Sequence, residues 1–215
     1  MLVERDASPR TATSRFAACR GDHLRVRRRW GYDHHGIYIS DDRVIQFGGR
    51  IGDKPHANID AVSLEKFEDG GTAEVVPHGV TQRWFRWLPW FGAWLPPADP
   101  PEKVIQRAEW LREHHPEGRY HLMGWNCEHA ANFCVNEYTE SLQVRRLFFV
   151  NAIVGTLVTY HVAFQSRRGR SMRTRLVLAR TAFSLVSVGL YNAGIRRFWR
   201  DVGREWRADE ASRRA

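Results

Sequence analysis

The sequence predicts an α+β protein that ends in a pair of apolar helices. Residues 21–80 are rich in strand-forming residues and turn signals, and two helical patterns follow between residues 100 and 138. Two long apolar runs come after them. With 215 residues, 43% of them hydrophobic, the chain can form one domain with a substantial core plus an appendage.

The first half begins with a segment, residues 1–20, that we expect to be disordered because it is rich in Ser, Thr, Pro and Arg. It lacks the apolar core of a secretory signal peptide. Residues 32–47 read as a β-hairpin with turn chemistry at residues 40–42. Residues 60–67 read as a short helix that ends near Gly70.

The second half of the domain is helical. Pro100 and Pro101 open a helix that continues through Leu111, and a second helix is expected from about residue 126 to residue 138. Cys127 lies at the start of this second helix.

Cys127 is the first candidate for chemistry. A cysteine at a helix N-terminus lies in a positive field that favours a thiolate, and a thiolate with a histidine in reach can form a covalent thioester. The other interpretation is a small buried side chain, which we keep for Cys19 and Cys134. A zinc site from Cys127, His129 and Cys134 fits no common ligand spacing.

Two motifs carry a family resemblance. Residues 34–38 (HHGIY) and residues 126–129 (NCEH) resemble the H-x-[AG]-I-Y strand and the later N-C-E-H-F helix start of the lecithin–retinol acyltransferase (LRAT) family. This family is a permuted branch of the NlpC/P60 papain-like fold. The resemblance therefore implies a permuted papain-like domain with an antiparallel sheet and a catalytic helix, which we place at residues 21–140.

The resemblance also assigns the site residues. Cys127 matches the nucleophile, His34 matches the general base, and Gln46 falls where the family usually has a histidine that orients this base. Gln46 can accept a hydrogen bond from the imidazole but carries no charge. Ala130 stands where the family usually has phenylalanine. No cofactor and no metal are implied.

Strand alternation separates the two neighbouring histidines. His34, Gly36 and Tyr38 share one face of the predicted strand, and His35 and Ile37 share the other. Only one histidine can therefore serve Cys127. The resemblance selects His34, so we expect it within contact reach of Cys127, with Gln46 beside its far ring nitrogen.

The implied activity is that of a thiol-dependent acyltransferase or phospholipase A-type enzyme acting on glycerophospholipids through an acyl-thioester on Cys127. One alternative is a cysteine peptidase or amidase of the NlpC/P60 type, which needs an open polar groove and export. The other is a non-catalytic protein that binds or remodels membranes, and Gln46 and Ala130 are the residues that favour it.

A tryptophan-rich insertion lies at residues 84–97. It holds four tryptophans, two phenylalanines and three prolines, which argue against a regular buried helix. Tryptophan prefers the membrane–water interface, so the segment is either an interfacial contact or a flap packed over the core.

The C-terminal region, residues 141–215, predicts a membrane anchor. Residues 147–164 contain no Asp, Glu, Lys or Arg, and a spanning helix needs about 17–25 such residues. Residues 176–195 form a second run interrupted by Arg180. We expect a hydrophobic helical hairpin that holds the protein at the cytoplasmic face of a membrane. A soluble helical pair packed on the domain is the alternative, and under the anchor interpretation a chain ending near Ser141 would keep the site folded.

The formal net charge of +9 predicts an anionic partner. No nucleic-acid-binding motif is present in the sequence, so a phospholipid membrane is the expected partner and nucleic acid is not. The identity of the acyl acceptor does not follow from the sequence.

Overall fold

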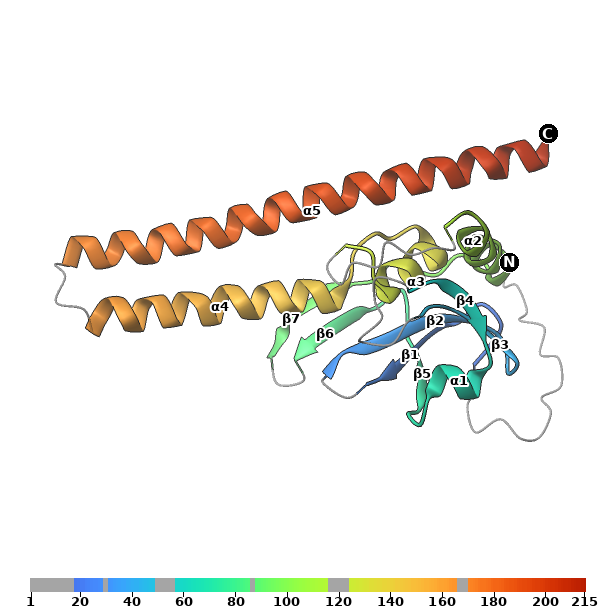
Figure 1. Cartoon of the computed structure of the whole chain (residues 1–215), viewed down its shortest axis with the longest axis horizontal. Helices are drawn as coiled ribbons and strands as arrows, with labels where there is room; N and C mark the ends of the chain where they lie inside the picture. The colour runs from blue at the N-terminus through green and yellow to red at the C-terminus, as the bar shows by residue number, and fades with distance from the viewer. Residues whose placement is uncertain (1–17, 29–30, 49–56, 86–87, 116–123, 166–169) are drawn as a thin grey trace.

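The computed structural model describes residues 18–28, 31–48, 57–85, 88–115, 124–165 and 170–215. At its centre is an antiparallel sheet with the strand order β4-β3-β2-β1-β5 (Figure 1). The strands are β1 His23–Arg27, β2 Asp33–Ser40, β3 Arg43–Phe47, β4 Ile59–Val62 and β5 Ala73–Val75. The predicted hairpin at residues 32–47 is confirmed as β2 and β3.

Helices lie on both faces of this sheet. Helices α2 (Pro101–His114) and α3 (Cys127–Asn136) lie on one face, and the short helix α1 (Leu64–Glu68) lies on the other (Figure 1). The α+β class is thereby confirmed. The disordered segment predicted at residues 1–20 lies outside the described residues except for its last three.

The helix expected at residues 60–67 is partly wrong. Asp60 and Val62 belong to β4, where they pair with Gln46 and Val44 of β3. The helix begins only after Ser63, whose hydroxyl accepts a hydrogen bond from the Lys66 N–H at 3.2 Å and caps α1.

Strand alternation divides the core into two clusters. Ile37, Ile39 and Ile45 face α2 and α3, whereas Val26 and Val44 face α1. We call the first the helical-face cluster and the second the α1-face cluster. Because the register of β1, β2 and β3 is fixed by these two apolar sets, every other side chain on the strands is assigned to a face as well.

The tryptophan-rich insertion forms a two-stranded ribbon. Strands β6 (Thr81–Phe85) and β7 (Leu88–Trp94) pair antiparallel, which agrees with the argument against a helix. Trp94 is 55% exposed. The side chains of residues 82–93 lie outside the described set, so the predicted interfacial contact stays a prediction.

Two long helices form an apolar hairpin. Helices α4 (Leu142–Gln165) and α5 (Arg170–Arg214) run side by side and extend beyond the sheet (Figure 1). Both are long and apolar enough to cross a membrane. The 24 residues of α4 span about 36 Å at 1.5 Å per residue, against a hydrocarbon core of about 30 Å.

The hairpin exposes apolar side chains outward and pairs polar ones inward. Leu157 and Leu178 are 62% and 63% exposed. Arg180 of α5 donates a hydrogen bond to the Asn151 side-chain oxygen of α4 at 3.3 Å and lies against Gly155, where a larger side chain would collide with it. Asn151 and Arg180, a polar side chain from each apolar run, therefore contact each other.

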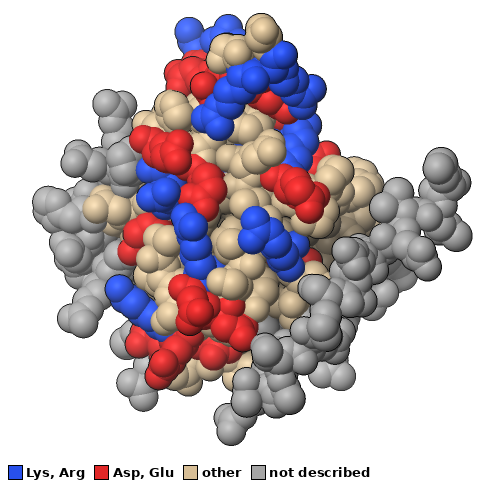
Figure 2. Space-filling view, turned by 90° about the vertical axis from the view of Figure 1, so that its right-hand side faces the viewer, with Lys and Arg blue, Asp and Glu red and all other residues tan. Residues whose placement is uncertain are grey.

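The last part of α5 belongs to the core of the sheet domain. Trp199 and Trp206 are buried in the helical-face cluster, and Trp199 stacks on Trp125 with ring centroids 4.4 Å apart. Trp206 meets Trp110 edge-on at 5.6 Å. On the end of the molecule seen in Figure 2, acidic and basic side chains alternate, as on a surface that faces water.

This packing revises the expectation for a truncated chain. A chain ending near Ser141 lacks both buried tryptophans, so we no longer expect the Cys127 site to stay folded in it. The C-terminal region is at once a hydrophobic hairpin and a part of the core.

Replacement of Trp206 tests this assignment. Trp206→Ala removes a fully buried ring and should lower the free energy of unfolding by about 3–5 kcal/mol. Trp94→Ala is the matched control, because its ring is mostly exposed, and should change it by less than about 0.5 kcal/mol. Thermal unfolding of the full chain in detergent measures both, and equal effects of the two variants would contradict the packing of α5 on the domain.

Candidate active site

Cys127 is the first residue of α3 and is 3% exposed. Asn126 caps the helix, because its side-chain oxygen accepts the His129 N–H at 3.0 Å. The Cys127 thiol points to the backbone carbonyl of Asp33, with 3.8 Å between Sγ and O. The sulfur thus lies at the positive end of α3 and beside the first residue of β2.

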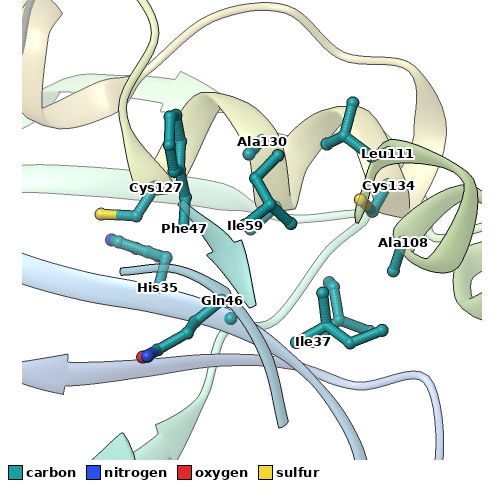
Figure 3. A pocket seen from close by; sticks show the side chains of 13 residues that line it. His35, Ile37, Gln46, Phe47, Ile59, Ala108, Leu111, Cys127, Ala130 and Cys134 are labelled. Carbon is teal, nitrogen blue, oxygen red and sulfur yellow. The ribbon is translucent and has the colours of Figure 1, made fainter. Parts of the chain in front are cut away.

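Cys127 lines a small cavity between the helices and the sheet. The lining is mostly apolar and comes from β2, β3, β4, α2 and α3: His35, Gly36, Ile37, Ile45, Gln46, Phe47, Ile59, Ala108, Leu111, Cys127, Ala130, Ala131 and Cys134. In Figure 3 the His35 ring, from β2, and the Cys127 side chain, from α3, lie near one another and extend toward the same side of the cavity. The imidazole that shares a cavity with the thiol is therefore that of His35.

His34 lies on the other face of the sheet. It pairs in register with Val26, and its ring contacts Phe67 with centroids 5.2 Å apart. Both neighbours belong to the α1-face cluster. The described contacts of His34 thus lie on the face of α1, and the predicted contact between His34 and Cys127 stays a prediction.

Gln46 lies where it was predicted relative to His34. His34 Nε2 and Gln46 Oε1 are 2.7 Å apart, across the neighbouring strands β2 and β3. In Figure 3 the Gln46 side chain points away from Cys127. The structure thus forms the His34–Gln46 pair, while the role of this pair at Cys127 stays a prediction.

The physical reason is the apolar pattern of β2. Ile37 and Ile39 alternate with Gly36 and Tyr38, and α3 buries its face of small residues against the two isoleucines. His35 shares the face of these isoleucines, so packing of α3 on the sheet brings Cys127 to His35.

His35 is the first member of a chain of three histidines. His35 Nδ1 is 2.9 Å from His23 Nε2, and His23 Nδ1 is 2.9 Å from His78 Nε2. His78 Nδ1 ends the chain at the Pro96 carbonyl, 3.3 Å away. Burial is the main cause that lowers the pKa of His35 and His23 well below the usual value, so both rings are neutral near pH 7.

The sequence contains only part of the signal for this chain. His23 precedes an alternating apolar pair, Leu24 and Val26, which assigns it to the same face as His35 once strands β1 and β2 are paired. His78 lies after β5 in a segment without regular structure, and nothing in the sequence predicts its approach to His23.

Glu128 connects the site to the hairpin. Its buried carboxylate accepts hydrogen bonds from the Ser141 hydroxyl and from the Gln143 N–H at 3.0 Å, at the start of α4. Burial raises the pKa of Glu128. The Gln143 side chain in turn binds both backbone groups of Asp33, at 2.8 and 2.9 Å. The first residue of β2 is therefore held between α4 and Cys127.

The surroundings of Cys19, Cys134 and His129 favour no chemical role for these residues. Burial raises the pKa of Cys134 to about 12, and Cys19 is exposed. His129 hydrogen bonds Asn126 and stacks on Trp199 at 6.1 Å. Among the described residues, no group of three or more His, Cys, Asp or Glu side chains could hold a metal ion.

The chain thus combines an antiparallel sheet, a helix that begins with a cysteine and shares a cavity with a strand histidine, and an apolar helical hairpin. A family model, lecithin retinol acyltransferase, matches residues 17–140, and the chain belongs to this family. Membership indicates an acyltransferase-type activity. No curated protein matches the chain.

The buried His129 should make stability depend on pH. Burial lowers its pKa from 6.5 to about 3, so the unfolded chain takes up a proton first as the pH falls. Stability is then complete above about pH 6.5 and is lost progressively toward pH 3. His129→Phe should reduce the fall in melting temperature between about pH 7.5 and pH 5, without abolishing it because His23 and His35 remain. An unchanged fall would show that His129 does not contribute.

Proposed function

We propose that this protein is a thiol-dependent acyltransferase or phospholipase A-type enzyme that acts on glycerophospholipids through an acyl-thioester on Cys127. The observation that carries the proposal is the position of Cys127: a buried thiol at the N-terminus of α3, sharing a cavity with a strand imidazole, within an LRAT-family domain. We also propose that the domain is a permuted papain-like fold.

The proposed reaction has two half-reactions. An imidazole of β2 takes the proton of the Cys127 thiol while the sulfur attacks an ester carbonyl carbon and forms the C–S bond. The C–O bond then breaks, the imidazolium returns the proton to the leaving oxygen, and a lysophospholipid departs. Water, an alcohol or an amine next attacks the thioester, and its proton passes through the imidazole to the departing sulfur.

The position of Cys127 suits the charge that develops on the carbonyl oxygen. Amides in the first turn of a helix lack carbonyl partners within the helix, so we propose the backbone N–H of Cys127 as an oxyanion donor. The positive end of the α3 dipole adds to this stabilisation.

The hairpin supports a lipid substrate. Helices α4 and α5 expose apolar side chains along their length, and we propose that they insert into a membrane with the sheet domain on the cytoplasmic side. The two hydrogen bonds between Gln143 and Asp33 fix the start of α4 to β2, the strand beside Cys127. A substrate dissolved in the same membrane is then near the site.

The resemblance assigns the general base to His34 and its orientation to Gln46, and this assignment stays a prediction. The 2.7 Å bond of this pair supports it, and the position of His34 on the α1 face opposes it. For the alternative of an NlpC/P60-type peptidase or amidase, the cavity beside Cys127 is unfavourable, because it is small and mostly apolar.

Trapping of the acyl-enzyme tests the function. Full-length protein mixed with phosphatidylcholine vesicles should gain the mass of one acyl chain in intact-mass spectrometry, because the thioester is covalent. Cys127→Ala should show no gain. Cys134→Ala is the matched control, because burial keeps that thiol protonated, and it should still form the adduct. Absence of the adduct in the wild type, or its persistence in Cys127→Ala, would refute the thioester.

Vesicle flotation tests insertion of the hairpin. Wild-type protein should stay with vesicles in about 1 M salt, where the Debye length falls to about 3 Å and basic residues alone would release it. A Leu157→Asp/Leu178→Asp variant should detach, since each charge at mid-helix costs about 3 kcal/mol on insertion. Gln165→Asp places the same charge at the end of α4 and should stay bound. Release of the wild type by salt would rule out insertion.

A further inference from the structure

We infer that another cavity, at the domain end of the α4–α5 hairpin, binds the phosphate of an anionic phospholipid headgroup. This headgroup site is lined, among others, by Glu140, by Arg145 of α4, and by Tyr191 and Arg196 of α5. It shares no described lining residue with the cavity beside Cys127. The inference goes beyond the proposed activity, because it concerns a lipid that is held at the hairpin and not the ester that is cleaved.

The headgroup site lies where both helices of the hairpin change from charged to apolar. On α4, Arg145 and Arg146 come directly before the uncharged run of residues 147–164. On α5, Arg196 comes directly after the apolar run of residues 176–195. Because Arg145 and Arg196 line the same cavity, the two changes lie at one level. In an inserted hairpin this is the level of the lipid phosphates, at the edge of the hydrocarbon core.

Two arginines from different helices converge on one anionic group in the headgroup site. Arg145 Nη1 and Arg196 Nη2 each donate to the Glu140 carboxylate at 2.7 Å, one to each oxygen. A single carboxylate balances only one of the two guanidinium charges, so one positive charge remains. The Arg196 side chain is 58% exposed, and Glu140 is its only hydrogen-bond partner among the described residues. Its other N–H groups are therefore available to a phosphate, which guanidinium groups bind in a bidentate manner.

Tyr191 adds a hydrogen-bond donor to the headgroup site. Its hydroxyl is buried and, within the described part of the chain, has no hydrogen-bond partner. Its ring packs on Phe148 of α4 with centroids 4.6 Å apart, so the ring is held between the two helices. A buried hydroxyl without a partner costs free energy, and a phosphate oxygen in the cavity would supply the missing acceptor. Tyrosine is also enriched at the membrane interface, where one end of the ring is apolar and the other polar.

The charge of the headgroup site favours an anionic lipid. In phosphatidylglycerol the phosphate charge is uncompensated, whereas the choline of phosphatidylcholine brings a second cation beside the arginines. Basic pockets between membrane helices are known to hold anionic headgroups. The acyl chains of the same lipid can lie along exposed apolar side chains of α4 such as Leu147. Inorganic phosphate lacks this apolar contact, so a lipid is the source of phosphate that the surroundings favour.

Binding of a lipid that Cys127 cannot cleave tests the headgroup site. The full chain in a neutral detergent is titrated with dialkyl-ether phosphatidylglycerol, which contains no ester, and native mass spectrometry counts the bound lipid. We expect one tightly held lipid, and about 10-fold weaker binding of dialkyl-ether phosphatidylcholine. Equal affinities for the two lipids would overturn the anionic selectivity. Displacement of the lipid by inorganic phosphate at a similar concentration would overturn the lipid as the source of the phosphate.

A pair of neighbouring arginines provides the matched variants. Arg196→Gln should weaken the binding of the ether phosphatidylglycerol by about 10-fold or more, the usual loss for a hydrogen bond to a charged group. Arg197→Gln removes the same charge one position further along α5, outside the cavity, and should weaken binding by less than about 3-fold. Equal losses in the two variants would show attraction by net charge alone and would overturn the site.

Tyr191→Phe covers the case in which Arg196→Gln does not fold. It removes a hydroxyl that bonds no other described residue, so the variant should melt at the wild-type temperature without lipid. It should bind the ether phosphatidylglycerol about 3-fold or more weakly than the wild type, and unchanged affinity would overturn the site. None of these measurements needs turnover. Failure of the acyl-enzyme to form would therefore leave the headgroup site standing, and failure of lipid binding would leave the proposed function standing.

Discussion

The two hydrogen bonds between the Gln143 side chain and the Asp33 backbone join the apolar hairpin to the sheet domain. Asp33 begins β2, and its carbonyl also faces the Cys127 sulfur. Glu128, the neighbour of Cys127, holds the Gln143 N–H from the other side. The sheet, the helix that begins with Cys127 and the first turn of the apolar hairpin therefore meet at one peptide, so a movement of α4 relative to the domain would be transmitted to the surroundings of Cys127.

The hairpin is anchored to the domain at both of its ends. Gln143 and Glu128 fix the start of α4, and Trp199 and Trp206 fix the last part of α5 by burial in the helical-face cluster. Between these points apolar side chains are exposed, and Arg180 of α5 donates a hydrogen bond to Asn151 of α4. A hairpin tethered at both ends restricts rotation of the domain about it, so insertion would set the orientation of the site to the membrane surface as well as its distance.

The sequence predicted the α+β class and the β2–β3 hairpin, whereas the roles of Cys127, His34 and Gln46 stay predictions. Alternation along β2 was readable, and Ile37 and Ile39 show which face packs on a helix, so the face of Cys127 could be inferred from apolar burial alone. The motif match pointed to His34 instead. The positions of His78 and Trp199 could not be predicted, because each depends on a contact across the fold, to β1 and to Trp125 respectively, that no local pattern specifies.

The histidine chain places a particular constraint on the chemistry. Desolvation lowers the pKa of His35 well below its usual value, so this ring is neutral near pH 7 in the cavity that Cys127 also lines. Such a site gains its reactive charges only when an ester carbonyl lies near the helix N-terminus, where the oxyanion and the imidazolium stabilise each other at low dielectric. The proposed function would then require the small, mostly apolar cavity beside Cys127 to open before a lipid ester can reach the thiol.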